Sequence, residues 1–84
     1  MQTAQPYVHN QAETTKKDRV ASLIHLYCTA SAAARREPHP RLRELRQVHA
    51  ELIEHRLVMA AEELFGHPIA DFGDAVLHWY RCVH

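Results

Sequence analysis

Residues 40–65 read PRLRELRQVHAELIEHRLVMAAEELF, and the triplet GHP follows at 66–68. Apolar side chains recur in this stretch at spacings of three and four residues, which is the pattern of an amphipathic helix. The predicted apolar face comprises Leu42, Leu45, Val48, Leu52, Ile53, Leu57, Ala60 and Leu64. A glycine takes the left-handed conformation that ends a helix, and a proline two residues later cannot continue it. The stretch therefore predicts one long helix over about 40–65.

Three polar side chains fall near the middle of this apolar face at seven-residue intervals, namely His49, Arg56 and Glu63. In one interpretation they lie at the edge of a shallow core, with their charged heads in solvent. In the other, they set the register of a helix pair, as buried polar residues do in coiled coils. The sequence leaves both interpretations open.

Two further helices are predicted on either side of this one. Pro38 and Pro40 bracket His39, and because a residue before proline is biased away from the helical region, a break is expected there. Upstream, a helix over about 15–36, capped by Thr15, would bury Val20, Leu23, Ile24, Tyr27, Ala30 and Ala34. Downstream, a helix over about 68–83 would bury Ile69, Phe72, Val76, Trp79, Tyr80 and Val83, with Phe72, Trp79 and Tyr80 as anchors. Because Gly73 lies in its first turns, Asp71 is an alternative to Pro68 as its start.

The chain is 84 residues long, which is enough for one small domain. We expect a flexible N-terminal segment at 1–14 and a single helical domain at 15–84. The predicted fold class is all-α: a long antiparallel hairpin of the first two helices with the third, C-terminal helix folded across it, forming a three-helix bundle. Because so short a chain has a small core, a homodimer that completes the bundle is a further expectation.

Charge is distributed unevenly along a chain whose ten basic and ten acidic residues balance. Residues 1–50 hold eight basic and four acidic residues, whereas residues 51–84 hold two and six. This asymmetry favours antiparallel association of basic and acidic ends, within the fold or between copies. The candidate partner-binding residues are a basic corner and two acidic residues of the second half: Arg35, Arg36, Arg41, Arg43, Arg46, Glu62 and Glu63.

The eight histidines raise the question of a metal site. Asp74, His78 and Cys82 follow one another at i, i+4 and i+8 with His84 just beyond, which makes them weak metal-ligand candidates. The same spacing also serves a solvated helix face, so no metal is favoured and no cofactor is expected. The sequence has no P-loop, GxGxxG, HExxH, GxSxG or CxxC motif, and we therefore do not expect an enzyme.

The expected function is that of a small cytoplasmic protein-binding or regulatory module, which occupies a surface of a larger protein partner. Adaptors and phage- or mobile-element-encoded inhibitors are proteins of this kind. One alternative is a nucleic-acid-binding helical protein that uses the basic corner, and another is a histidine- and cysteine-based metal sensor. Two cysteines without a CxxC pair suggest a reduced compartment, and no signal peptide or membrane-spanning segment is expected.

Overall fold

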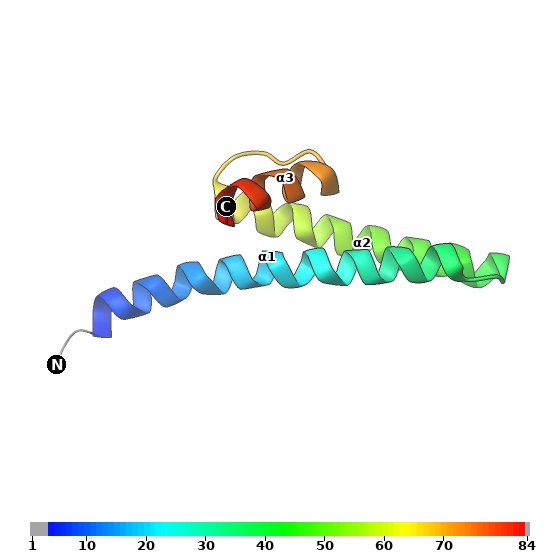
Figure 1. Ribbon diagram of the computed structural model, residues 1–84, viewed down its shortest axis with the longest axis horizontal. Coiled ribbons are helices and arrows are strands. Elements are labelled where there is room, and N and C mark those ends of the chain that lie inside the picture. Colours follow the sequence, from blue (N-terminus) through cyan, green and yellow to red (C-terminus); the bar gives the residue numbers. More distant parts are fainter. Residues whose placement is uncertain (1–3, 84) are drawn as a thin grey trace.

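The computed structural model describes the backbone of residues 4–83 and the side chains of residues 15–83. Three helices and no strand make up this part of the chain: α1 (Ala4–Arg36), α2 (Pro40–Phe65) and α3 (Phe72–Val83). The helices α1 and α2 run antiparallel as a hairpin, and α3 lies along the C-terminal half of α2 (Figure 1). The predicted all-α three-helix bundle is confirmed, and the molecule is elongated, with extents of 58 × 24 × 20 Å.

Helix α1 begins at Ala4, well before the predicted start near Thr15. Residues 4–14, predicted as a flexible segment, form its first turns, while residues 1–3 and His84 lie outside the described residues. The only proline of this stretch, Pro6, lies in the first turn, where a helix tolerates proline. Thr15 is therefore inside the helix and does not cap it. Neither α1 nor any other described helix is long and apolar enough to cross a membrane.

The turn at 37–39 ends α1 and begins α2, as the two prolines predict. His39 is the N-cap of α2, with an extended backbone at φ −81° and ψ 120°. Its Nδ1 accepts hydrogen bonds from the backbone N–H of Arg41 at 3.2 Å and of Leu42 at 3.5 Å. A histidine ring thus satisfies two of the amide groups that the first turn of a helix leaves unpaired. Pro40 follows at the first helical position, where its missing N–H costs nothing.

Gly66 ends α2 in the left-handed conformation that the sequence predicts, with φ 78° and ψ 20°. Its backbone N–H donates to the carbonyl oxygen of Glu62 at 2.8 Å, which closes the last turn. Gly66 is the only described residue with a positive φ, and a Cβ built on it would meet nothing within 4 Å. The cost of a side chain here is therefore a cost of backbone conformation alone.

Opposite stability effects are expected for Gly66→Ala and Gly73→Ala. Gly66→Ala should lower the free energy of unfolding by about 1 kcal/mol, because alanine disfavours a positive φ. Gly73 lies inside α3, and its added Cβ would touch only Asp71 Oδ1 at 3.6 Å, an ordinary contact. Gly73→Ala should therefore raise the same quantity by about 0.5–1 kcal/mol. Urea denaturation measures both free energies of unfolding. Changes of the same sign in the two variants would contradict the different backbone conformations of Gly66 and Gly73.

Helix α3 begins at Phe72, later than 68 and directly after the alternative start at Asp71. The side chain of Asp71 accepts from the backbone N–H of Asp74 at 2.9 Å, so Asp71 caps this helix. Two carboxylates of α2 hold the preceding loop: Glu62 Oε2 accepts from Ile69 N–H and Glu54 Oε2 from Phe72 N–H, both at 3.0 Å. These bonds to backbone amides keep residues 68–71 out of the helix and fix α3 against α2.

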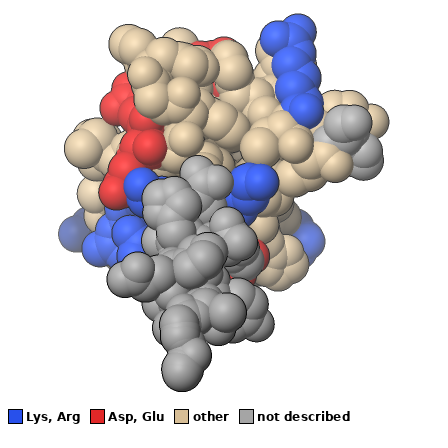
Figure 2. Space-filling view, turned by 90° about the vertical axis from the view of Figure 1, so that its left-hand side faces the viewer, with Lys and Arg blue, Asp and Glu red and all other residues tan. Residues whose placement is uncertain are grey.

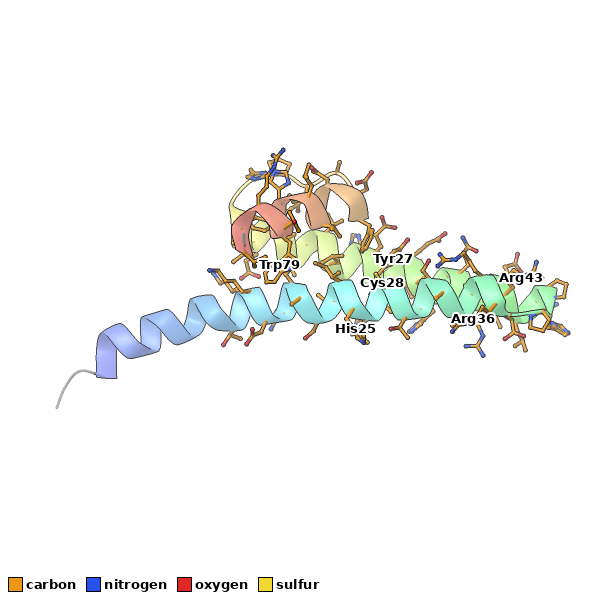
Figure 3. All side chains as sticks on the ribbon, in the orientation of Figure 1. His25, Tyr27, Cys28, Arg36, Arg43 and Trp79 are labelled. Atoms are coloured by element: carbon orange, nitrogen blue, oxygen red, sulfur yellow. The ribbon has the colours of Figure 1, made fainter. Side chains whose placement is uncertain are left out.

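The hydrophobic core is small and joins all three helices with the second loop. Its fully or almost fully buried members are Val20, Leu57, Ala61, Ile69 and Ala75. Around them pack Leu23, Ile24, Val58, Ala60, Leu64, Phe65, Phe72 and Trp79. The rings of Tyr27 and Phe72 lie 4.3 Å apart, and Figure 3 shows Tyr27 on the side of α1 that faces α3. Phe72 and Trp79 are anchors as predicted, but Tyr80 is not, because 59% of it is exposed.

The face of α2 that packs against α1 matches the predicted one only in part: Ile53 and Leu57 are buried as predicted, but the first half of the predicted face is not. The buried residues of α2 are Ala50, Ile53, Leu57 and Ala61, whereas Leu42, Leu45, Val48 and Leu52 are 46–60% exposed. The contact face is thus rotated by roughly a quarter of a turn, at about 100° per residue. Small alanines let two helices approach closely, and this selects the alanine-bearing side of α2. His49, Arg56 and Glu63 are exposed, as the first interpretation of the polar line requires.

Candidate binding surface

The five arginines of the basic corner lie at one end of the hairpin, around the turn between α1 and α2. Arg36 and Arg43 mark this end in Figure 3. The corner comprises Arg35, Arg36, Arg41, Arg43 and Arg46, and all five are exposed. The structure therefore brings this predicted group of residues together.

Three of these arginines are engaged within the chain. Arg43 donates from Nε to the carbonyl oxygen of Glu37 at 3.0 Å, and from Nη2 to that of Pro38 at 3.2 Å. Arg46 Nε pairs with Glu37 Oε1 at 2.8 Å. Arg35 Nη1 donates to Ser31 Oγ at 2.9 Å. Arg43 and Arg46 thus fasten the turn, which leaves Arg36 and Arg41 as the uncommitted cations of the corner.

Glu37 is the centre of this arrangement. The hydrogen bond from Arg46 lowers the pKa of its carboxyl group below the usual range, and the backbone N–H of His39, 3.3 Å from Oε2, lowers it further. Glu37 therefore stays charged at a more acidic pH than an ordinary glutamate, and its pair with Arg46 persists there. The sequence analysis did not single out Glu37, because its partner is nine residues away across the turn.

The two acidic candidates of α2 have different roles. Glu62 is partly buried and accepts from the backbone of the second loop, so it supports the fold. Glu63 is exposed and lines a groove between α1 and α2. Figure 2 views the molecule from the end where α1 begins, and shows a column of acidic side chains on the left directly beside basic ones. Of these two candidates, only Glu63 remains available to a partner.

The four weak metal-ligand candidates do not form a complete site. His78 Nδ1 lies 3.3 Å from Asp74 Oδ1 and 2.9 Å from the carbonyl oxygen of the same residue. Cys82 is an exposed thiol, and His84 lies outside the described residues. Within the part of the chain that the structure describes, no three histidine, cysteine or acidic side chains converge as metal ligands.

A histidine that the sequence analysis did not connect with His78 lies beside it. The ring centroids of His67 and His78 are 4.7 Å apart, and the ring of Phe65 lies 5.8 Å from that of His78. His67 Nδ1 lies 3.1 Å from the carbonyl oxygen of Pro68. The two imidazoles therefore pack with an aromatic ring where the second loop meets α3, which explains their residue type without a ligand.

An open groove of about 650 Å³ lies between α1 and α2. None of its lining residues belongs to α3. The apolar part of the lining comes from Leu23 and Leu26 of α1 and from Met59 and Ala60 of α2. Leu26 is 49% exposed and Met59 is 56% exposed. Its volume falls in the range of about 300–1,000 Å³ that is typical of binding pockets. We call it the α1–α2 groove.

Charged side chains border the α1–α2 groove. Arg19, Arg56 and Glu63 line it together with Ser22 and His55, and Lys16 lies next to it. Among the described side chains, Arg19, Arg56 and Glu63 take part in no ion pair. Three cations and one carboxylate thus surround an apolar floor. This combination suits an apolar segment flanked by acidic groups.

Sequence reasoning missed the α1–α2 groove, although a signal was present. Leu26 and Met59 are large apolar residues that fit neither of the predicted apolar stripes. Apolar residues left over after the core has been assigned are candidates for a binding surface. Their meeting across the hairpin depends on the register of α1 against α2, which the sequence alone does not supply.

Comparison with known proteins supplies no family for this chain: no protein-family model matches it, and no curated protein or solved structure matches it significantly.

Proposed function

We propose that this chain is a small protein-binding module without chemistry of its own, which docks an amphipathic helix of a larger partner in the α1–α2 groove. The observation that carries the proposal is the exposed apolar floor of the groove, formed by Leu26 and Met59. An exposed apolar patch with a polar rim is typical of a protein interaction site. The cationic rim favours a helix with carboxylates beside its apolar ridge, because opposite charges steer association.

Such a module acts as a regulator or inhibitor by covering a surface that its partner needs. The two exposed, unpaired cysteines support a reducing, cytoplasmic setting. Nucleic-acid binding through the basic corner is the weaker candidate, because Arg43 and Arg46 are already bonded to the turn. Metal sensing has no converging ligands among the described residues to support it.

The proposal is tested by affinity capture with a matched pair of variants. Tagged wild type, Leu26→Glu and Leu77→Glu are used to capture proteins from a source-cell lysate at high salt, and mass spectrometry and absorbance read the eluates. Leu77 is 45% exposed on α3, outside the groove, so its variant controls for an added charge. We expect one stoichiometric partner with wild type and Leu77→Glu, and roughly thirtyfold weaker capture with Leu26→Glu, the effect of losing one central anchor.

Two results would contradict this function. One is a partner that Leu26→Glu captures as well as wild type does, with far-ultraviolet circular dichroism showing an unchanged fold. The other is recovery of nucleic acid in a parallel capture at low salt, if added salt removes it and if it disappears when Arg36 and Arg41 are both replaced by Gln, because this would assign binding to the basic corner.

A further inference from the structure

The side of α2 that faces away from α1 carries a second row of apolar side chains, the outer stripe. Its members and their exposed fractions are Leu45 (60%), Val48 (49%), Leu52 (59%) and Met59 (56%). Leu52 lies about 140° around the helix from Leu57, a centre of the contact with α1. These residues therefore add nothing to the core of one chain, although they are four of the nine large apolar residues that are exposed among residues 15–83.

The spacing of the outer stripe is that of a coiled-coil seam. Positions 45, 48, 52, 55 and 59 alternate steps of three and four, and only His55 among them is polar. An average step of about 3.5 residues keeps such a narrow stripe facing one neighbouring helix over its whole length. A seam of this kind fits a helix lying along α2.

The charges at the two ends of α2 indicate the direction in which a neighbouring helix would run along the outer stripe. Arg41 and Arg43 lie in its first turn and Glu62 and Glu63 in its last, while the first turn has no acidic residue and the last no basic one. This is the reverse of what the helix dipole favours, since the N-terminal end of a helix is positive. An antiparallel neighbour with the same charges would place its acidic end beside the basic end of α2.

Two pairs of positions at equal distances on either side of Leu52 are complementary: Leu45 with Met59 as apolar residues, and Arg41 with Glu63 as opposite charges. Between them, Val48 of the outer stripe lies opposite Arg56, whose long side chain can cover it with its aliphatic part. A two-fold axis brings such positions of two identical chains together. Arg41 and Glu63 are both exposed and form no ion pair within the described side chains.

The surface of the chain leaves room for such an interface. Its accessible surface is 6237 Å², whereas a compact monomer of this mass exposes about 5,100 Å². A standard protein interface takes about 800 Å² from each partner. The chain thus exposes about 1,100 Å² more than a compact monomer of its mass, which exceeds one partner's share of such an interface.

We propose that a second copy of the chain covers the outer stripe, with the two α2 helices packed antiparallel about a two-fold axis near Leu52. This dimer goes beyond the proposed function, because it uses the outer stripe and leaves Leu26 of the α1–α2 groove outside the α2 seam. His55 and Met59 border both surfaces, so the tests of the two proposals use Leu52 and Leu26, which each belong to one of them, and can fail independently.

The mass of the protein in solution tests the dimer. Multi-angle light scattering at tens of micromolar should give twice the 9.7 kDa chain mass for wild type. Leu52→Lys places two like charges across the axis and should weaken association at least about thirtyfold, leaving one chain mass. Leu77→Lys, at a leucine of α3 that is 45% exposed, should keep the dimer. A wild-type monomer, or a dimer that Leu52→Lys leaves intact, would overturn the proposal.

A charge exchange tests the antiparallel orientation. Arg41→Glu and Glu63→Arg should each raise the dissociation constant by about two- to tenfold, because each replaces an attraction at both ends of the seam by a repulsion. The double variant should restore wild-type affinity, since the exchanged side chains of the two copies would again meet with opposite charges. Sedimentation equilibrium measures all three, and additive losses in the double variant would contradict the antiparallel arrangement.

Discussion

Leu57→Ala is expected to lower the free energy of unfolding by about 2–5 kcal/mol, the range for a buried leucine whose cavity cannot fully collapse. Leu57 has no exposed surface and belongs to the cluster that joins the three helices. A chain of 84 residues has a total stability of about 4–13 kcal/mol at 0.05–0.15 kcal/mol per residue. The variant should therefore lose between a sixth of its stability and all of it.

Urea denaturation followed by circular dichroism measures this loss. Leu77→Ala is the matched control, because it makes the same substitution at a leucine that is 45% exposed. The control should change the free energy of unfolding by no more than about 0.5 kcal/mol. Equal losses in the two variants would mean that Leu57 is not the centre of the core.

Ala75→Leu is expected to displace α3. Ala75 is fully buried where the first turn of α3 meets the core, and a larger side chain has no space there. Overpacking of this kind costs about 1–3 kcal/mol. The short helix α3 should move before the longer α1–α2 hairpin does, because Phe72, Trp79 and a few loop hydrogen bonds hold it.

The fluorescence of Trp79, the only tryptophan, reports this displacement. Its emission should shift to longer wavelength in Ala75→Leu, while most of the helical circular dichroism remains. Ala70→Leu makes the same substitution at an exposed loop residue and should leave the emission unchanged. An unchanged emission in Ala75→Leu would show that the packing of α3 does not depend on a small residue at this position.

The helices could be predicted from the sequence because their signals are local. Pro38 and Pro40 end α1 through their effect on the local backbone, independently of tertiary contacts, and Gly66 with Pro68 ends α2 in the same way. The basic corner could also be predicted, since residues on both sides of a short turn must lie together. For α3, the apolar pattern indicates a start at 68 and Gly73 indicates one at Asp71; the cap that Asp71 forms agrees with the second.

The side of α2 that contacts α1 could be predicted only in part, because it depends on which apolar side of α2 fits closely against α1. The sequence pattern weights large residues such as Leu45 and Leu52, whereas close helix packing selects Ala50 and Ala61. The roles of Glu54 and Glu62 depend on backbone amides outside α2. Glu62 bonds to Ile69 in the second loop, and Glu54 bonds to Phe72 at the start of α3. The α1–α2 groove depends on the register of the hairpin, which is likewise a property of the folded chain.

A narrow core folds this chain and leaves the outer stripe of α2 exposed for a second copy to bind. The most direct test is urea denaturation of Leu52→Lys beside wild type, at a dilution where light scattering shows single chains. We predict free energies of unfolding that agree within about 0.5 kcal/mol, as for a surface substitution. A loss as large as that of Leu57→Ala would place Leu52 in the core and contradict the claim.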